Sequence, residues 1–335
     1  MTEPSILTNA RVLVTGGAGF VGSHIIDALL GEGCAEITAI DNMVRGRPAN
    51  LAAALRDPRV KIIEGDIRDH ALMERLVAQS DVVFHQAALR ITHCAAEPDQ
   101  AMEVMVDATY DLLMLCVTHK VRRVVMASSA SIYGDAAHFP TTEDEPPYPN
   151  RTLYGAAKSF GEGLLRSLND MYELDYVALR YFNVYGPRMD IHGKYTEVMV
   201  RWMERVAAGK PPLIFGDGAQ TMDLIDVRDV ARANILAAKA PVSDAVYNVG
   251  SQTETSLKQL AHIMTREMGR PDLVPEHVEE RSVNPVTRRI ASAVAARSDL
   301  GFAAAIPVDA GLRDLIAWWR EETGQVDAPM MAAGE

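Results

Sequence analysis

A glycine-rich turn near the N-terminus, residues 15–22, constrains the fold of this chain more than any other feature of the sequence. An apolar run typical of a buried strand, residues 11–15, leads into the turn, and a helical pattern, residues 23–30, follows it directly. Glycines allow the backbone to approach a pyrophosphate closely, and the first turn of the helix offers unpaired N–H groups. The alternative is an ordinary strand-to-helix turn. The residues predicted to contact a dinucleotide here are Gly16, Gly19, Phe20, Val21 and Gly22.

An acidic residue follows the next predicted strand. Asp41 stands directly after the apolar run 36–40, 19 residues beyond Gly22. A carboxylate at this place binds ribose hydroxyls and repels a ribose phosphate, which favours NAD over NADP as the cofactor. Arg45 and Arg47 lie nearby and work against that preference. Asp66, after the third strand, has two alternative roles, which are to accept a hydrogen bond from an adenine amino group or to cap the following helix.

Strand and helix patterns alternate through the first half of the chain. Short apolar runs at 36–40, 60–64, 81–85, 123–127 and 176–180 are separated by helical patterns that include 101–118 and 154–172. This alternation predicts an α/β fold, a Rossmann-like doubly wound parallel sheet covered on both faces, over residues 1–180. We expect a smaller C-terminal α/β substrate lobe over residues 181–325, with some later segments returning to the first lobe, and a loose tail over 326–335.

A tyrosine and a lysine, Tyr154 and Lys158, stand four residues apart at the start of a helical pattern. This spacing places both side chains on one helix face. The ammonium, together with a positively charged nicotinamide, is expected to bring the pKa of Tyr154 down toward the working range of a general base. Ser129 follows strand 123–127, at the edge of the sheet where ligands bind. The alternatives are an exposed lysine beside a half-buried tyrosine, and a serine that shapes a turn.

Composition excludes several classes of function. The 335 residues include 33 Lys and Arg against 45 Asp and Glu, a net charge of −12, which argues against nucleic acid or an anionic membrane as partner. No apolar run has the length of a membrane span, and the first ten residues do not have the pattern of a signal peptide. Three scattered cysteines favour reduced thiols and a cytoplasmic location. The nine histidines show no metal-ligand spacing, so we expect no metal site.

Taken together, these motifs resemble the extended short-chain dehydrogenase/reductase superfamily, in particular its NAD-dependent nucleotide-sugar epimerase/dehydratase family. The resemblance runs from about residue 11 to residue 320. It implies that Tyr154 is the catalytic acid and base, that Lys158 binds the nicotinamide ribose, and that Ser129 binds a sugar hydroxyl. Further cofactor contacts implied by the motifs are Asn42, Asp66, Ile67, Ala87, Ala88 and Tyr181. Implied contacts to the substrate are Ser129, Ser131, Tyr154 and Asn183.

The residues after Ser129 separate the reactions of the resembled family. Its 4,6-dehydratases would have Asp-Glu in place of Ala130 and Ser131, because loss of water needs an additional acid and base, and its decarboxylases would have Glu in place of Ser131. The resemblance therefore implies an NAD-dependent nucleotide-sugar epimerase of the UDP-hexose class that inverts C4 through a 4-keto intermediate. The alternatives are a nucleotide-sugar dehydratase and an NAD-dependent alcohol dehydrogenase that acts on a non-nucleotide substrate.

The chain departs from the family where arginines usually bind the substrate diphosphate. Met222 and Ser282 stand at those two places, and Arg281, Arg288 and Arg289 are close enough in sequence to substitute. Of these we assign Arg281 to the substrate. Arg90 lies in a loop expected near the sugar, and its alternatives are a contact to an acidic or amino sugar and a solvated loop residue. In the resembled family the helices matching 101–118 and 154–172 form a four-helix interface, which implies a homodimer.

Overall fold

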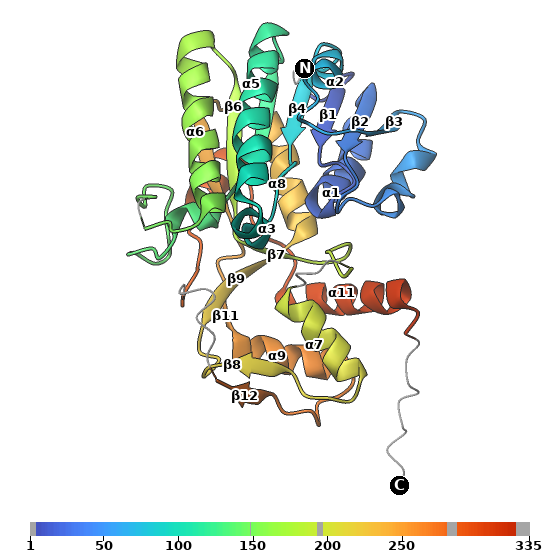
Figure 1. Ribbon diagram of the computed structural model, residues 1–335, viewed down its shortest axis with the longest axis vertical. Helices are drawn as coiled ribbons and strands as arrows, with labels where there is room; N and C mark the ends of the chain where they lie inside the picture. The colour runs from blue at the N-terminus through green and yellow to red at the C-terminus, as the bar shows by residue number, and fades with distance from the viewer. Residues whose placement is uncertain (1–4, 148, 193–196, 280–286, 326–335) are drawn as a thin grey trace.

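The computed structural model describes residues 5–147, 149–192, 197–279 and 287–325. Figure 1 shows two lobes, an upper one built on a large sheet and a smaller lower one that contains α7, α9 and α11. The tail predicted over 326–335 lies outside the described residues, as do Arg281 and Ser282. Within the described part of the chain, no helix combines the length and the apolar character needed to cross a bilayer.

The upper lobe is a seven-stranded parallel sheet with the strand order β10-β6-β5-β4-β1-β2-β3. The first three strands in the chain are β1 (Arg11–Thr15), β2 (Glu36–Asp41) and β3 (Val60–Glu64). The others are β4 (Val82–His85), β5 (Arg123–Ser129), β6 (Tyr176–Tyr181) and β10 (Ala245–Val249). The central strands are buried along nearly their whole length, as expected for a parallel sheet with both faces covered.

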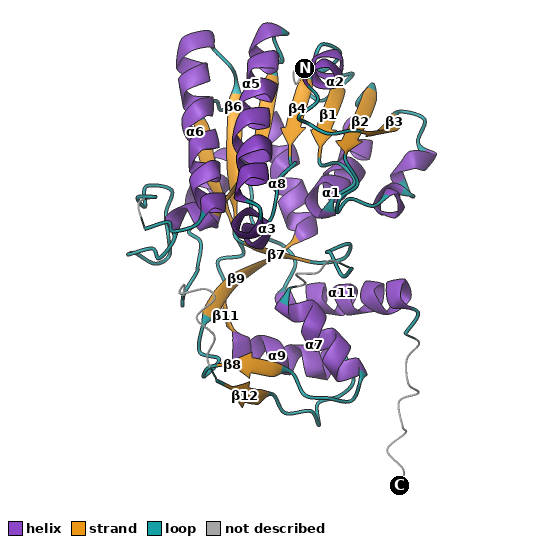
Figure 2. Ribbon diagram, viewed as in Figure 1, coloured by secondary structure: helices purple, strands orange, loops and turns teal. Residues whose placement is uncertain are grey.

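Helices cover both faces of this sheet, which confirms the doubly wound fold (Figure 2). On one face α1 (Phe20–Leu29) packs with α8 (Val227–Lys239), in a core that also takes Val12 and Val14 from β1. On the other face α2 (His70–Val77), α5 (Ala108–Thr118) and α6 (Leu153–Tyr172) pack over Leu13. Because side chains alternate along a strand, neighbouring residues of β1 thus contribute to two separate cores.

The helix predicted over 101–118 is not a continuous α-helix. It consists of α4 (Pro98–Met102), a π-helical turn at Glu103–Asp107 and α5, and α3 (Ile91–Ala96) precedes it. The π turn inserts one extra residue into the helical repeat, which the apolar spacing of the sequence does not reveal. In contrast, α6 is continuous over 20 residues, and Thr152 caps it by accepting a hydrogen bond from the N–H of Gly155 at 3.1 Å.

Among its described residues, the lower lobe contains two small sheets and three helices. One sheet has the order β11-β9-β7, formed by β11 (Glu254–Ser256), β9 (Thr221–Asp226) and β7 (Asn183–Tyr185), and the other pairs β12 (Glu276–Val278) with β8 (Leu213–Phe215). A third core joins α7 (Val198–Ala207), α9 (Leu257–Glu267) and α11 (Val308–Thr323). The chain crosses between the lobes repeatedly. After β9 in the lower lobe it returns to the upper lobe for α8 and β10, and after β11 it returns again for α10 (Val294–Leu300).

Candidate active site

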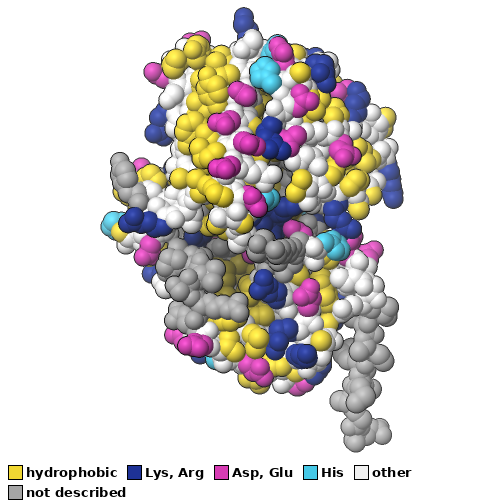
Figure 3. Space-filling view, viewed as in Figure 1, with side chains coloured by type: hydrophobic (Ala, Val, Ile, Leu, Met, Phe, Trp, Pro, Cys, Tyr) yellow, Lys and Arg dark blue, Asp and Glu magenta, His cyan; other side chains and the backbone are white. Residues whose placement is uncertain are grey.

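A cavity of about 750 Å³ lies between the lobes, at the carboxyl ends of β1, β4, β5 and β6. Figure 3 shows charged side chains of both signs gathered around the region between the two lobes. The cavity is lined by residues from both lobes, from the glycine turn at one side to the residues around Asp190 and Arg289 at the other. This is the crevice in which doubly wound sheets bind their ligands.

The glycine turn lines the cavity as predicted, with Gly16, Gly19, Phe20, Val21 and Gly22 all at its wall. Gly16 has φ +66°, and a Cβ atom there would lie 2.9 Å from Cα of Ala87. A Cβ at Gly22 would lie 2.2 Å from the carbonyl oxygen of Gly16. The turn is therefore closed to larger residues, and it presents bare backbone and the N-terminus of α1 to the cavity, which suits a pyrophosphate.

Asp41 ends β2 beside this turn and is only 8% exposed. Its carboxylate accepts hydrogen bonds from the N–H groups of Ala18 at 3.1 Å and Met43 at 3.0 Å. Burial raises the pKa of Asp41, and these backbone bonds oppose that shift. The two hydrogen bonds fix the carboxylate at the cavity wall, and its binding of a ribose hydroxyl stays a prediction.

Asp66 lines the same end of the cavity together with Ile67 and Asn42. The alternative that it caps the following helix is wrong, because Asp69 caps α2 by accepting from the N–H of Leu72 at 3.0 Å. Asp66 instead binds Arg68 and the amide of Asn42, and the hydrogen bonds from Arg68 lower the pKa of Asp66 to about 2.

Tyr154 and Ser129 meet at the centre of the cavity. Tyr154 lies in the first turn of α6 and Ser129 ends β5, so the helix and the sheet fix their positions independently. Burial raises the pKa of Tyr154, while a side-chain hydrogen bond with Ser129 and the charges of Arg45 and Arg289 act to lower it. Ser129 also accepts from the N–H of Ser131 at 3.1 Å. The Tyr154 hydroxyl is thus held by a partner that itself has a fixed position.

Lys158 lies on α6 one turn after Tyr154, and its binding of the nicotinamide ribose stays a prediction. It lies outside the cavity wall, where its ammonium donates to the carbonyl of Ala127 at 2.7 Å and stands 5.8 Å from the ring centroid of Tyr154. Burial lowers the pKa of Lys158 to about 8, and the pKa of Tyr154 is raised, not lowered. The reason is desolvation, which disfavours both charged groups and which the helix spacing of the sequence does not show.

The other predicted contacts also border the cavity. Asn183 donates to the carbonyl of Asp223 at 3.1 Å, and the hydroxyl of Tyr181 bonds with Gln86 and Asn234, both at 3.0 Å. Arg90 is 19% exposed in its side chain and lies 3.7 Å from Glu197, which contradicts the alternative of a solvated loop residue. The lining residues in this group are Ala87, Ala88, Arg90, Ser131, Tyr181 and Asn183.

The residues considered for binding a diphosphate lie in different surroundings. Met222 packs against the core of the lower lobe and is not part of the cavity wall. Arg288 binds Glu254 at 2.7 and 2.9 Å, whereas Arg289 lines the cavity. Arg281 lies outside the described residues.

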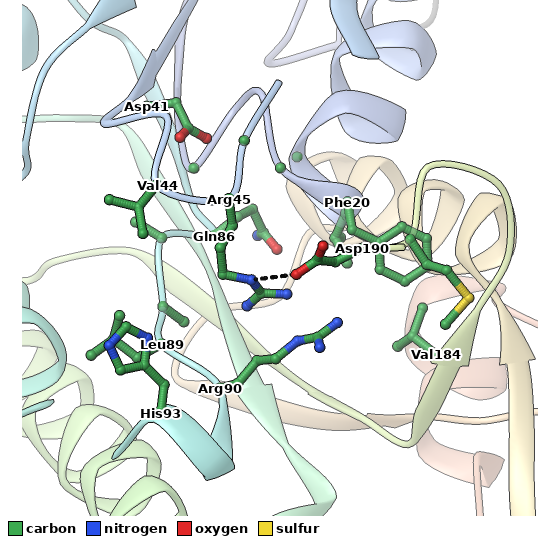
Figure 4. A pocket seen from close by; sticks show the side chains of 18 of the residues that line it. Phe20, Asp41, Val44, Arg45, Gln86, Leu89, Arg90, His93, Val184 and Asp190 are labelled. Carbon is green, nitrogen blue, oxygen red and sulfur yellow. Dashed lines mark hydrogen bonds and ion pairs between the residues drawn. The ribbon is translucent and has the colours of Figure 1, made fainter. Parts of the chain in front are cut away.

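Two carboxylates at the cavity wall, Asp190 and Glu197, were not predicted from the sequence. Figure 4 shows Asp190 between Arg45 and Arg90, with a hydrogen bond of 3.2 Å from Nε of Arg45 to Asp190. Burial lowers the pKa of Arg45. Arg45 and Asp190 are 145 residues apart in the chain, so no local pattern could have paired them.

Comparison with known proteins agrees with this geometry. The family model described as the NAD dependent epimerase/dehydratase family matches residues 12–250. The chain belongs to this family. A putative UDP-glucose 4-epimerase of Methanocaldococcus jannaschii is 32% identical over 313 residues, which cover 92% of this chain and 98% of that protein. A dTDP-glucose 4,6-dehydratase of Streptomyces griseus is 31% identical and covers 97% of this chain and 98% of its own length.

Solved structures of relatives have the same fold. A UDP-N-acetylglucosamine 4-epimerase from Methanobrevibacter ruminantium, in complex with UDP-N-acetylmuramic acid, superimposes with a TM-score of 0.88 and 32% identity. The match covers 94% of this chain and 99% of that one. The protein is therefore a member of a family of NAD-dependent enzymes that modify nucleotide sugars, and NAD is its cofactor. Relatives of similar identity carry out epimerisation and dehydration, so family membership leaves the reaction to be argued from the site.

Proposed function

We propose that this protein is a nucleotide-sugar 4-epimerase. The proposal rests on the Ser129–Tyr154 pair at the cavity wall. Each carboxylate that lines the cavity among the described residues already has a hydrogen-bond or ion-pair partner in the protein. Asp190 and Glu197 lie against arginines, Asp66 binds Arg68, and Asp41 accepts backbone N–H groups. Dehydration requires an acid and a base in addition to the tyrosine. Ala130 and Ser131, which follow Ser129, supply neither.

The residues around the glycine turn suit NAD. Gly16 and Gly22 permit the tight turn whose backbone N–H groups suit a pyrophosphate, and the carboxylate of Asp41 suits the ribose hydroxyls. When bound, NAD supplies an acceptor and donor of hydride together with a positively charged ring, so that a sugar alcohol passes reversibly through a ketone. A Cβ atom at Gly16 would strike the backbone of Ala87 and one at Gly22 would strike the carbonyl oxygen of Gly16, so the tight turn requires glycine at both positions.

In this mechanism Tyr154 moves the proton of the sugar hydroxyl. Its phenolic oxygen takes the proton when the alcohol is oxidised and returns it when the ketone is reduced on the other face. Ser129 forms a hydrogen bond with the hydroxyl of Tyr154 and binds the sugar oxygen, which keeps the two reacting oxygens next to each other. Arg45 and Arg289 favour the phenolate through their charges, and Lys158 adds a buried positive charge behind the ring.

A panel of nucleotide sugars incubated with the NAD-loaded protein in deuterated water tests the reaction. We expect a product of unchanged mass, inverted at C4, without deuterium, detected by mass spectrometry and NMR. Loss of water with uptake of deuterium would show a dehydratase, and release of NADH with a simple alcohol would show a dehydrogenase. Tyr154→Phe should reduce turnover at least 1,000-fold, at the lower range of losses when an essential acid–base group is removed, while NAD stays bound. Tyr247→Phe, in β10 and outside the cavity wall, is the control.

We also propose that two copies associate through α5 and α6. Large apolar side chains are exposed on these helices and on α4, namely Met102, Tyr110, Phe160, Met171 and Tyr172. Burying such a face against its copy removes apolar surface from water, as in other obligate dimers. Light scattering after size exclusion should give twice the mass of the chain. Phe160→Glu should shift it to the monomer mass, and Val274→Glu, exposed in the lower lobe, should not.

A further inference from the structure

The π-helical turn at Glu103–Asp107 contacts two of the loops that line the cavity. Glu103 accepts a hydrogen bond at 2.6 Å from Arg68, which belongs to the loop between β3 and α2. The sulfur of Met105 accepts a hydrogen bond at 3.2 Å from the backbone N–H of Leu89, in the loop between β4 and α3. Turns of this kind are frequent at functional sites, and this one reaches both loops.

The loop between β4 and α3, residues 86–90, forms a continuous part of the cavity wall. Its backbone is held near each end, because the N–H of Ala87 donates to Oγ1 of Thr15 at 3.2 Å and the N–H of Leu89 donates to Met105. Arg90 follows Leu89 as the N-cap residue of α3, and Figure 4 shows its side chain extending from this loop toward Asp190. A shift of Leu89 would therefore move both the wall and Arg90.

Met105 is also part of a small core that this loop shares with the helix carrying Tyr154. The loop packs against the core through Ala88 and Leu89, and the first turn of α6 packs against it through Leu153 and Tyr154. Met105 itself is only 4% exposed. The buried members of the core are Cys94, Ala101, Met105 and Ala157.

We propose that Met105 is a positioning residue for the cofactor NAD. Its side chain fills an apolar core and its sulfur accepts the N–H of Leu89, and a pure hydrocarbon side chain cannot do both. The hydrogen bond holds the loop between β4 and α3 in the conformation that lines the cofactor cavity, and the shared core keeps that loop in place relative to Tyr154. The inference rests on NAD as the cofactor and goes beyond the proposed function, because it is the same for an epimerase and a dehydratase.

Two substitutions separate the hydrogen bond from the packing. Met105→Leu keeps the volume and the apolar character of the side chain but removes the acceptor, so the urea midpoint of unfolding should change little. Met105→Gln keeps an acceptor but places an amide in an apolar core, so the urea midpoint should fall. The assay is the rate at which the loaded enzyme releases labelled NAD into an excess of unlabelled NAD.

The rate of NAD release should follow the hydrogen bond and not the stability of the variants. We expect release about 5- to 10-fold faster from Met105→Leu, the effect of losing one hydrogen bond, and within about twofold of the wild-type rate from Met105→Gln. Met114→Leu is the control, because it makes the same exchange on α5 outside the cavity wall, and it should release NAD at the wild-type rate.

Hydrogen exchange at the amide of Leu89 gives a readout that needs only Met105→Leu. In the NAD-loaded protein this amide should exchange faster in Met105→Leu than in the wild type, because it has lost its acceptor. Wild-type NAD release from Met105→Leu, or unchanged exchange at Leu89, would overturn the proposal. Faster release from Met105→Gln than from Met105→Leu would also overturn it, since release would then follow the loss of stability.

Discussion

Replacing Glu162 by Gln tests whether the network behind the active site is held by charge. Glu162 lies on α6 one turn after Lys158, and its carboxylate accepts two hydrogen bonds from Arg180 at 2.7 and 2.9 Å and one from Ser128. The two charged side chains are 9% and 10% exposed. Removing one partner of a buried ion pair leaves the other charge uncompensated, which costs about 3 to 5 kcal/mol. Because glutamine keeps the shape and one acceptor, we expect a loss of about 3 kcal/mol in the free energy of unfolding.

The same substitution should move the pH profile of the reaction. The charge of Glu162 raises the pKa of Lys158, which burial lowers to about 8. Without Glu162 the ammonium is lost at a lower pH, so the alkaline limb of kcat/KM should shift toward neutral pH. Urea unfolding and the pH profile are measured for Glu162→Gln and for the control Glu74→Gln, which changes an exposed glutamate on α2. A loss below about 1 kcal/mol with an unchanged alkaline limb would refute the reasoning.

Two further outcomes are expected. Gly16→Ala should lower the NAD content of the purified protein at least tenfold, because φ at Gly16 is +66° and the new Cβ would lie 2.9 Å from Ala87. The control Gly31→Ala has free space around the new Cβ and should retain NAD. Equal NAD contents in the two variants would contradict this prediction. Acid should destabilise the fold as the pH falls from 6.5 to about 4 for His24 and to about 3 for His85, because burial lowers the pKa of these histidines to those values while the unfolded histidines are protonated below 6.5. The loss at pH 4.5 should be about 2 kcal/mol for each histidine, seen as a lower urea midpoint than at pH 7, and identical midpoints would argue against it.

The sequence was sufficient to predict the parts of the molecule that depend on local patterns. The first six strands of the sheet are four to seven residues long and mostly apolar, and the glycine turn, Ser129 and Tyr154 stand at the ends of regular elements. Short strands of the lower lobe such as β7, β8, β11 and β12 have only three residues each, which is too few for an alternating pattern.

Contacts between distant segments could not be predicted in this way. Asp190 and Arg45 come together because the lobes meet, and the burial that shifts the pKa of Tyr154 and Lys158 depends on how α3 and α6 pack. Arg288 and Arg289 are equivalent in the sequence, and only the pairing of their segment with β9 directs one to Glu254 and the other to the cavity.

The late return of β10 to the upper sheet has a consequence for protein engineering. A fragment that ends at residue 180 would lack β10 and leave β6, which is buried along its whole length, with unpaired N–H and C=O groups at an open edge. Such an edge recruits other chains and promotes aggregation. The two lobes are therefore not exchangeable modules. A chimera that imports a new sugar-binding lobe has to splice several separate segments around Ala245–Val249 and keep that strand from the host.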